Sequence, residues 1–230
     1  MPRLTLQSAV AGLKRRYGKP AAPISREPFA LILWEQVAYL VPDSTRRAAF
    51  LQLKARVGLS PEDILAAPPA TLRTIARAGG PIAVADRAER MQASAELAMS
   101  RFGGDLRNAL KLPLPLARRA LGRFPMIGEP GADKILVFTR TARALPLDSN
   151  GLRVLQRLGL VPKGKDYRGS YRRAQETLAP ALPRSYDGLI AGYQLLRQHG
   201  QEVCRRNAPD CPACPLRSRC PSGNLPSIRA

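Results

Sequence analysis

Several residue types are scarce or missing in this 230-residue sequence, and each shortage narrows what the protein can be. No cysteine occurs before Cys204, so the preceding residues hold neither a disulfide nor a thiolate site. No apolar run reaches the ~20 residues that span a bilayer, which argues against a membrane protein. Aromatic residues make up 5% of the chain and alternating β-branched residues are rare, whereas Ala, Leu and Arg abound. This composition predicts an all-α protein.

Acidic residues are also in short supply. The sequence has 17 Asp and Glu against 37 Lys and Arg, a net charge of +20. Such a charge favours a polyanionic partner, because Lys and Arg bound to phosphates release condensed counterions. The alternative is an arginine-rich chain with a merely basic surface. A membrane surface fits less well, since no strongly amphipathic basic helix stands out. No secretory signal precedes the chain, so a reducing cytoplasm is the expected compartment.

Helix starts and stops along the chain predict many short helices joined by short loops. Residues 60–63, Ser-Pro-Glu-Asp, combine an N-cap, a proline in the first turn and acids beside it. Pro42, Gly79-Gly80 and Gly103-Gly104 mark helix ends. Residues 1–26 read as basic and irregular. The expected helices cover residues 29–41, 43–57, 60–67, 70–78, 83–102, 105–110, 115–121, 130–140, 149–158, 170–178 and 186–199. This pattern fits an α-bundle of two lobes.

The cysteines that are present share one short loop. They are Cys204, Cys211, Cys214 and Cys220, with spacings of six, two and five residues. Thiolates bind metals, and four at this spacing can surround one tetrahedral or cubane centre. Four-cysteine zinc sites usually contain two C-x-x-C pairs, and this loop contains one, which favours an iron–sulfur cluster. Disulfides are disfavoured in a reducing compartment. Ligand type alone leaves zinc open.

Two further features precede the cysteine loop. Residues 124–132 read as a tight turn between two helices, with Gly128 in the turn. Backbone N–H groups beside the second helix's N-terminus suit a DNA phosphate. An ordinary helical hairpin without a DNA-binding role would show the same sequence pattern. Asp148 follows and can lie at a helix N-terminus, where a lone aspartate is usually an N-cap. The order of hairpin, aspartate and cysteine loop is more informative than any one of them.

In that order, the features resemble the endonuclease III and MutY-type branch of the helix–hairpin–helix DNA glycosylase superfamily. The cysteine spacing, with His199-Gly200 before it, is similar to that branch's 4Fe–4S loop. Residues 124–128, Phe-Pro-Met-Ile-Gly, are similar to its Leu-Pro-Gly-Val-Gly hairpin. Asp148 and the Arg-Val-Leu-Gln-Arg-Leu-Gly stretch after it resemble the segment with the family's catalytic aspartate. Pro28-Phe29 resembles the start of its first barrel helix, and the resemblance covers residues 26–221.

The resemblance implies a two-lobed all-α fold. A six-helix barrel with the hairpin would occupy residues 26–143, and an iron–sulfur domain would combine residues 1–25 with 144–230. A structural 4Fe–4S cluster would be held by Cys204, Cys211, Cys214 and Cys220. Double-stranded DNA would bind across the lobes with the target base flipped out of the stack. We expect a cytoplasmic, nucleoid-associated monomer that removes damaged or mispaired bases.

The resemblance also implies roles for particular residues. Asp148 would stabilise an oxocarbenium-like sugar. Glu35, counted without gaps from Pro28, falls where MutY-type enzymes have the glutamate that protonates the leaving base. A glutamate in an apolar helix can stay protonated; alternatively, Glu35 faces solvent or caps a neighbour. The candidate DNA-binding residues are Met126, Gly128, Gly131, Arg205 and Arg206, and the two arginines can instead form a solvated basic face.

The chain departs from the family at one chemically decisive position. Bifunctional members carry a lysine two residues after the last hairpin glycine, where it forms a Schiff base and allows strand cleavage. Pro130 stands there, so we predict a monofunctional glycosylase. Lys134 lies about one helical turn further on, which leaves a weak lyase as an alternative. A non-catalytic DNA-binding or damage-sensing protein on the same scaffold is another, and a zinc-ribbon-like module is a third.

Three other side chains have two interpretations each. Tyr39 can stack on a base or pack in the core, and we expect core packing. Leu40 can wedge into the duplex or be buried. His199, the only histidine, is expected to be structural rather than a general base. The sequence does not identify the damaged base, because the pocket would be formed by side chains from several helices, and the sequence alone does not place them.

Overall fold

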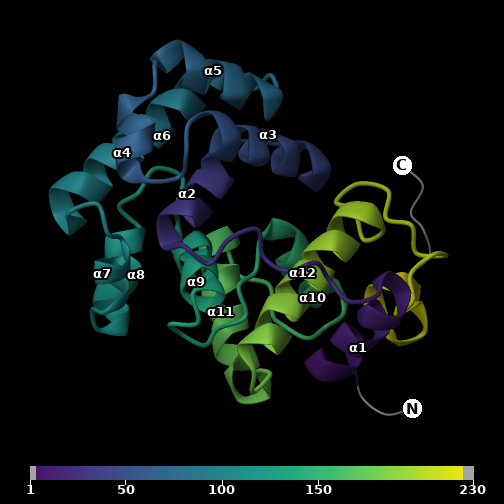
Figure 1. Ribbon diagram of the computed structural model, residues 1–230. Coiled ribbons are helices and arrows are strands. Elements are labelled where there is room, and N and C mark those ends of the chain that lie inside the picture. The colour runs from purple at the N-terminus through teal and green to yellow at the C-terminus, as the bar shows by residue number, and fades with distance from the viewer. Residues whose placement is uncertain (1–3, 225–230) are drawn as a thin grey trace. The chain divides into compact units, whose positions relative to one another are not determined.

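The computed structural model describes residues 4–224, and the chain divides into two compact units (Figure 1). The continuous unit is Pro23–Thr141, and the split unit combines Met1–Ala22 with Ala142–Ala230. The ends of the expected cluster domain, residues 1–3 and 225–230, lie outside the described residues. All regular elements in the described part are helical, which confirms the predicted all-α class. None of these helices combines the length and the apolar character needed to cross a membrane.

The continuous unit is organised around its longest helix, α6 (Val84–Phe102). Helices α2, α4 and α5 pack against α6, whose buried face carries small and flexible apolar side chains such as Ala95 and Met91. Small residues on that face let the neighbouring helices approach closely. The other helices of this unit are α2 (Pro28–Gln36), α3 (Asp43–Arg56), α4 (Pro61–Ala66), α5 (Pro69–Ala78), α7 (Arg107–Leu110), α8 (Leu114–Leu121) and α9 (Glu129–Phe138).

The helix start predicted at Ser60 is present. The Ser60 hydroxyl accepts from the Asp63 N–H at 3.1 Å, and the Asp63 carboxylate accepts from the Ser60 N–H at 3.0 Å. The bond from the Ser60 N–H, followed by the Ser60 hydroxyl, lowers the pKa of the Asp63 carboxyl group. This reciprocal capping box satisfies two backbone donors that would otherwise have no intrahelical partner. Local sequence is sufficient to specify such a start, which explains why it could be predicted.

The apolar segment at residues 29–41 was expected to be one helix, and that expectation is wrong at its end. Helix α2 stops at Gln36, and the chain then turns through Leu40, whose φ is +51°. The cause is Arg87 of α6, which is 2% exposed and donates from Nη1 to the Val37 carbonyl at 2.7 Å. Its guanidinium also donates to the Gly79, Gly80 and Ile82 carbonyls. A buried cation thus replaces the helical hydrogen bonds, and the chain leaves the helix early.

The split unit is built from four longer helices: α1 (Leu6–Tyr17), α10 (Ser149–Arg157), α11 (Tyr167–Leu178) and α12 (Tyr186–Glu202). Helices α10 and α12 lie side by side, and α1 packs against α12 (Figure 1). Their shared core includes Leu13, Leu155, Tyr171 and Leu196, all fully buried. Short 3₁₀ turns at Ala179–Ala181, Arg217–Arg219 and Pro221–Asn224 connect or follow these helices.

Helix α1 was not predicted, because the first 26 residues were interpreted as irregular. Its start is a capping box in which Thr5 Oγ1 accepts from the Ser8 N–H, and Ser8 Oγ accepts from the Thr5 N–H. Leu6, Ala9 and Leu13 form its buried face at helical spacing. The basic residues that suggested irregular structure lie in its last turn, where cations are favourable beside the negative end of the helix dipole.

Candidate functional sites

A pocket of about 220 Å³ lies in the continuous unit where three segments meet. These are the end of α2, the start of α6 and the turn between α8 and α9. Gln36 connects α2 with the turn and with α6. Its amide nitrogen donates to the Pro125 carbonyl at 2.9 Å and to Ser94 Oγ at 2.7 Å. The lining residues are Glu35, Gln36, Tyr39, Ala83, Arg87, Arg90 and Met126. Glu35 and Met126, predicted separately from the sequence, therefore share one pocket.

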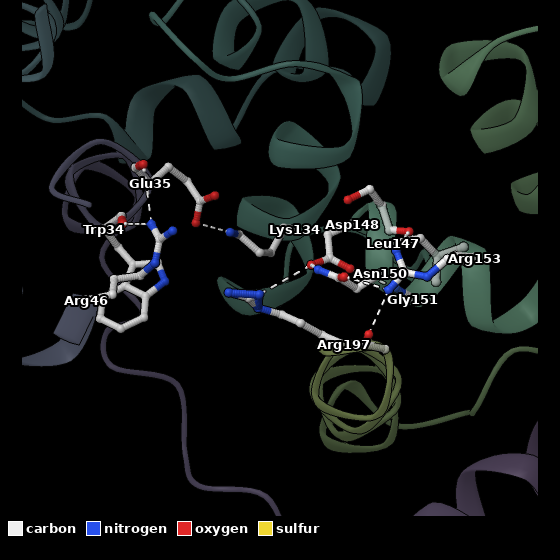
Figure 2. A network of polar contacts seen from close by, with 12 residues as sticks. Trp34, Glu35, Arg46, Lys134, Leu147, Asp148, Asn150, Gly151, Arg153 and Arg197 are labelled. Atoms are coloured by element: carbon white, nitrogen blue, oxygen red, sulfur yellow. Dashed lines mark hydrogen bonds and ion pairs between the residues drawn. The ribbon is translucent and has the colours of Figure 1, made fainter. Parts of the chain in front are cut away.

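The carboxylate of Glu35 forms an ion pair with Lys134 of α9. Figure 2 shows the Glu35 side chain directed at Lys134 Nζ, which donates to Oε1. The Lys134 side chain is 7% exposed and the Glu35 side chain 27% exposed. A desolvated ammonium of this kind requires an opposite charge, because an unpaired buried cation is strongly destabilising. Glu35 lines the pocket, whereas Lys134 is not among its lining residues.

Left-handed backbone conformations cluster at the rim of this pocket. Ala83 (φ +48°) and Met126 (φ +69°) line it, and Leu40 (φ +51°) directly follows the lining residue Tyr39. Such conformations cost of order 1 kcal/mol or more for a residue with a side chain, and they are common at functional sites. Tyr39 is 41% exposed, so the expectation of core packing is wrong. Leu40 is 75% exposed, which excludes its burial.

The predicted hairpin consists of α8, a turn and α9. Phe124 anchors the turn in the core, and the Ile127 N–H donates to the Phe124 carbonyl at 3.0 Å. Gly128 is exposed and forms the N-cap of α9, where no side chain caps the helix. Gly131 is partly buried in the first turn of α9, and Met126, in the turn that precedes Gly128, is half exposed. The backbone N–H groups of Glu129 and Gly131 thus have no intrahelical partner, which suits an anion, whereas Pro130 contributes no N–H.

Helix α9 carries the two residues on which the lyase question depends. Pro130 occupies its first turn and has no side-chain nucleophile, and Lys134 lies in the next turn. Asp133, adjacent to Lys134, accepts from Arg118 Nε of α8 at 2.7 Å and is 2% exposed. Two neighbouring residues of α9 thus form ion pairs with different helices, Asp133 with α8 and Lys134 with α2.

In the split unit, Asp148 is the N-cap of α10. Its Oδ1 accepts from the Gly151 N–H at 2.8 Å, and its Oδ2 accepts from Asn150 Nδ2 at 3.1 Å. Arg197 of α12 places Nη1 at 3.3 Å from the same Oδ2 (Figure 2). These donors hold the carboxylate in place at the N-terminus of α10. The Asp148 side chain nevertheless stays 27% exposed, so the predicted N-cap is also accessible to a ligand.

Two arginines of α10 hold the backbone of the cysteine loop. Arg153 Nε donates to the Cys204 carbonyl at 3.0 Å, and Arg157 donates to the Arg205 and Arg206 carbonyls. Arg157 Nη1 also lies 3.4 Å from Cys204 Sγ. The side chains of Arg205 and Arg206 are exposed on the outer side of this loop. The arrangement leaves these predicted DNA-binding side chains accessible while their backbone is fixed.

All four cysteines line one cavity of about 240 Å³ in the split unit. They are free thiols, which excludes disulfides among them. Zinc binds sulfur at about 2.3 Å, yet among the described residues no three His, Cys, Asp or Glu side chains are gathered closely enough to hold a metal ion. One water occupies about 30 Å³ of liquid, so the cavity spans several atoms. Four thiol groups around one cavity are a donor set suited to a metal centre.

The surroundings of the cavity are partly apolar. Burial raises the pKa of the Cys214 and Cys220 thiols. Burial also lowers the pKa of His199 to about 4, so the imidazole is neutral near pH 7. The Tyr17 hydroxyl lies 3.0 Å from His199 Nδ1, and Cys214 Sγ lies 3.5 Å from Nε2. With 1% exposure and two partners, His199 packs as a structural residue, as expected.

Three functional side chains were missed or discounted in the sequence. Lys134 was judged only for its distance from Pro130, although an ionisable residue inside the apolar stretch of α9 could have signalled a buried charge. Arg197 and Arg157 carried no local signal, because their partners are 49 and 47 residues away. Only the packing of α10 against α12 and the cysteine loop shows what they contact.

Comparison with known proteins gives a consistent result. Endonuclease III from Bacillus subtilis is 26% identical over 163 residues, which cover 71% of this chain and 67% of that protein. Endonuclease III from Sulfolobus acidocaldarius is 26% identical over 200 residues, which cover 85% and 82%. The structure is similar to a trapped endonuclease III–DNA covalent intermediate, with a TM-score of 0.72, 21% identity and coverage of 96% and 97%. No family model matches the chain.

Proposed function

We propose that this chain, which belongs to the endonuclease III branch of the helix–hairpin–helix DNA glycosylase superfamily, is a monofunctional DNA glycosylase of base-excision repair. It would hydrolyse the N-glycosidic bond of a damaged or mispaired base in double-stranded DNA. Two relatives named endonuclease III support the class of reaction, and the fold shared with an endonuclease III–DNA complex supports the class of ligand. The net charge of +20 suits a phosphate-rich partner.

The proposed DNA contacts are distributed over both units. In the continuous unit, the N-terminus of α9 with Gly128 and Gly131 would bind a backbone phosphate, and Met126 would lie at the edge of that contact. In the split unit, the exposed side chains of Arg205 and Arg206 would contact further phosphates. The exposed Leu40 is the candidate to enter the duplex where the base is flipped out.

The observation that carries the proposal is the environment of Asp148. Its carboxylate is held by a backbone N–H, an amide and a guanidinium, yet about a quarter of the side chain is exposed. A fixed, accessible negative charge can stabilise the positive charge that develops on the sugar as the base departs. Glu35, in the pocket of the continuous unit, would supply the proton that makes the base a better leaving group.

Two features of α9 support a reaction without strand cleavage. Pro130 removes the amine at the position where bifunctional relatives carry their lysine. The Lys134 side chain is 7% exposed and its Nζ is directed at Glu35, and it does not line the pocket, which argues against its attack on C1′. Water is then the nucleophile, and the product is an intact strand with an abasic site.

We also propose that Cys204, Cys211, Cys214 and Cys220 hold a 4Fe–4S cluster. All four line one cavity that is larger than a single ion needs, and Arg157 contacts both Cys204 Sγ and the loop backbone. When bound, such a cluster would order the loop that carries Arg205 and Arg206. No step of hydrolysis requires it.

The proposal is tested on labelled duplexes that carry a panel of damaged and mispaired bases, analysed with and without hot alkali. We expect strand breaks only after alkali for at least one substrate. Asp148→Asn should lower the excision rate about 10²–10³-fold, because it removes a charge aligned with the transition state. Asparagine still caps a helix, so the fold should be retained.

Asp166→Asn is the matched control. Asp166 caps α11 as Asp148 caps α10, accepting from the Gly169 N–H at 2.7 Å, but it is exposed and carries no proposed catalytic role. Equal losses in the two variants would mean that Asp148 acts only as a cap. Breaks without alkali would show a lyase, and DNA binding without any breaks would favour the non-catalytic, damage-sensing alternative.

A further inference from the structure

We propose that Lys134 is a positioning residue that returns a proton to Glu35, so that the two side chains act in base excision as one unit with one transferable proton. This inference rests on the proposed glycosylase function and specifies how Glu35 obtains its proton. Lys134 is 7% exposed and is not among the residues that line the pocket, so it would act through Glu35.

The contact between the two residues is made by tertiary packing. Glu35 lies near the end of α2 and Lys134 in the second turn of α9, 99 residues later, and Nζ donates directly to Oε1 (Figure 2). The Lys134 side chain is almost fully buried, whereas Glu35 reaches the pocket. The geometry therefore connects an acid in the pocket with a proton donor behind it.

Glu35 has cationic neighbours, and Lys134 donates directly to its carboxylate. Lys134 approaches from α9, and Arg46 of α3 places Nη1 3.4 Å from the Glu35 carbonyl oxygen. Arg87 and Arg90 of α6 line the same pocket, and Tyr39, a neutral phenol, follows α2. Arg46 binds the backbone of Glu35 and Arg87 binds backbone carbonyls, so the carboxylate itself is paired with Lys134. The possibility raised from the sequence, that Glu35 stays protonated in an apolar helix, did not take this ion pair into account.

A carboxylate cannot protonate a leaving base, so the proton must come from its partner. In the proposed step, a proton moves from Lys134 Nζ to Glu35 Oε1, and the carboxyl group gives its proton to a nitrogen of the leaving base. The N-glycosidic bond breaks with its electron pair on the base, and Lys134 is left as a neutral amine. Water adds to C1′ and releases one proton, which restores the ammonium. The products are the protonated base and an abasic sugar.

The pH dependence of excision distinguishes this arrangement from a structural ion pair. Single-turnover rates are measured on the best substrate from pH 5 to pH 9 for the wild type, Lys134→Met and Lys134→Arg. The wild type should keep its rate through pH 8, since the pair holds its proton until the lysine titrates. Lys134→Met should excise the base slowly at neutral pH. Its excision rate should rise by about 10-fold for each unit by which the pH is lowered, until the pH reaches the midpoint of Glu35 titration.

Lys134→Arg separates charge from proton transfer. Arginine preserves the positive charge and the ion pair, so it should fold normally, but it does not release its proton in this pH range. The proposal requires that Lys134→Arg excise the base slowly at neutral pH and that its excision rate stay low at pH 8 and 9. Wild-type rates in Lys134→Arg would overturn the proton-return role, and a pH-independent loss in Lys134→Met would reduce Lys134 to a packing residue. Asp133→Asn, which removes the neighbouring ion pair to Arg118, controls for damage to α9.

A second readout does not depend on activity. Carboxyl ¹³C labelling of glutamate, with Glu35→Gln to assign the signal, follows the protonation of Glu35 directly. Glu35 should be ionised at pH 7 in the wild type and in Lys134→Arg, and it should titrate at higher pH in Lys134→Met. Identical titrations in the wild type and Lys134→Met would overturn the coupling. A wild type that excises no base while these titrations differ would reject the proposed function and leave the pair intact.

Discussion

The two carboxylates proposed for catalysis are held in different ways in the two units. Asp148 of the split unit takes two of its hydrogen bonds from residues within three positions of it, the Gly151 N–H and the Asn150 amide, and adds Arg197 from α12. Glu35 of the continuous unit lies near a helix end rather than at a cap, and its cation, Lys134, is 99 residues away. The contacts of one carboxylate are therefore specified mainly by local sequence and those of the other by the packing of α2 against α9.

The difference suits the two chemical roles. A stabilising charge should stay ionised through the reaction, and an N-cap with several donors achieves this. A proton donor must change its protonation state during the reaction, and coupling to one buried lysine allows that change. Asp148 should therefore depend less on any single neighbour than Glu35 depends on Lys134.

Removing one cysteine should produce the largest difference between the units. In Cys211→Ala we expect loss of bound iron and of the yellow-brown colour, lower soluble yield and weaker DNA binding, because metal binding and folding are coupled. The continuous unit contains no cysteine, so its own resistance to proteolysis should be retained. Iron content and mapped limited proteolysis measure both effects.

Ser218→Ala, at an exposed position of the same loop, is the control for this prediction. A Cys211→Ala protein that is free of iron and fully active would contradict it.

Arg197→Met should have a smaller effect, on activity alone. Asp148 would keep its bonds from Gly151 and Asn150, so we expect about a 10-fold lower excision rate, equivalent to roughly 1.4 kcal/mol, rather than the full loss of Asp148→Asn. Single-turnover kinetics with Arg197→Lys as the charge-retaining control measure this. A loss as large as that of Asp148→Asn would show that Arg197, not the cap, keeps Asp148 in place.

Leu40→Ala should have the smallest effect. Leu40 is exposed, so the free energy of unfolding should change by about 0.5 kcal/mol or less. Affinity for the lesion duplex should fall about 3- to 10-fold if the side chain enters the stack. Leu40→Gly removes the same side chain and relieves the positive φ, so it should bind DNA like Leu40→Ala while being more stable. Unchanged affinity in both variants would remove Leu40 from the DNA contact.

Features encoded within a few residues were predictable. The Ser60 cap, the hairpin at residues 124–132 and the cysteine spacing each depend on neighbours in sequence, and the structure contains the helices and the turn that they predict. The start of α1 was encoded in the same way by Thr5 and Ser8 but was overlooked, because the basic residues after it were given more weight. The early end of α2 was not predictable, since it depends on Arg87, 50 residues away from the Val37 carbonyl that it binds.

The sequence by itself determined the helical class, the cap at Asp148 and the set of four cysteines, because helix propensity, capping and ligand spacing act over a few residues. Only the tertiary structure decided that Tyr39 and Leu40 face outward and that Glu35 meets Lys134. Those outcomes depend on which helices pack together, and the resulting burial determines which charges must pair.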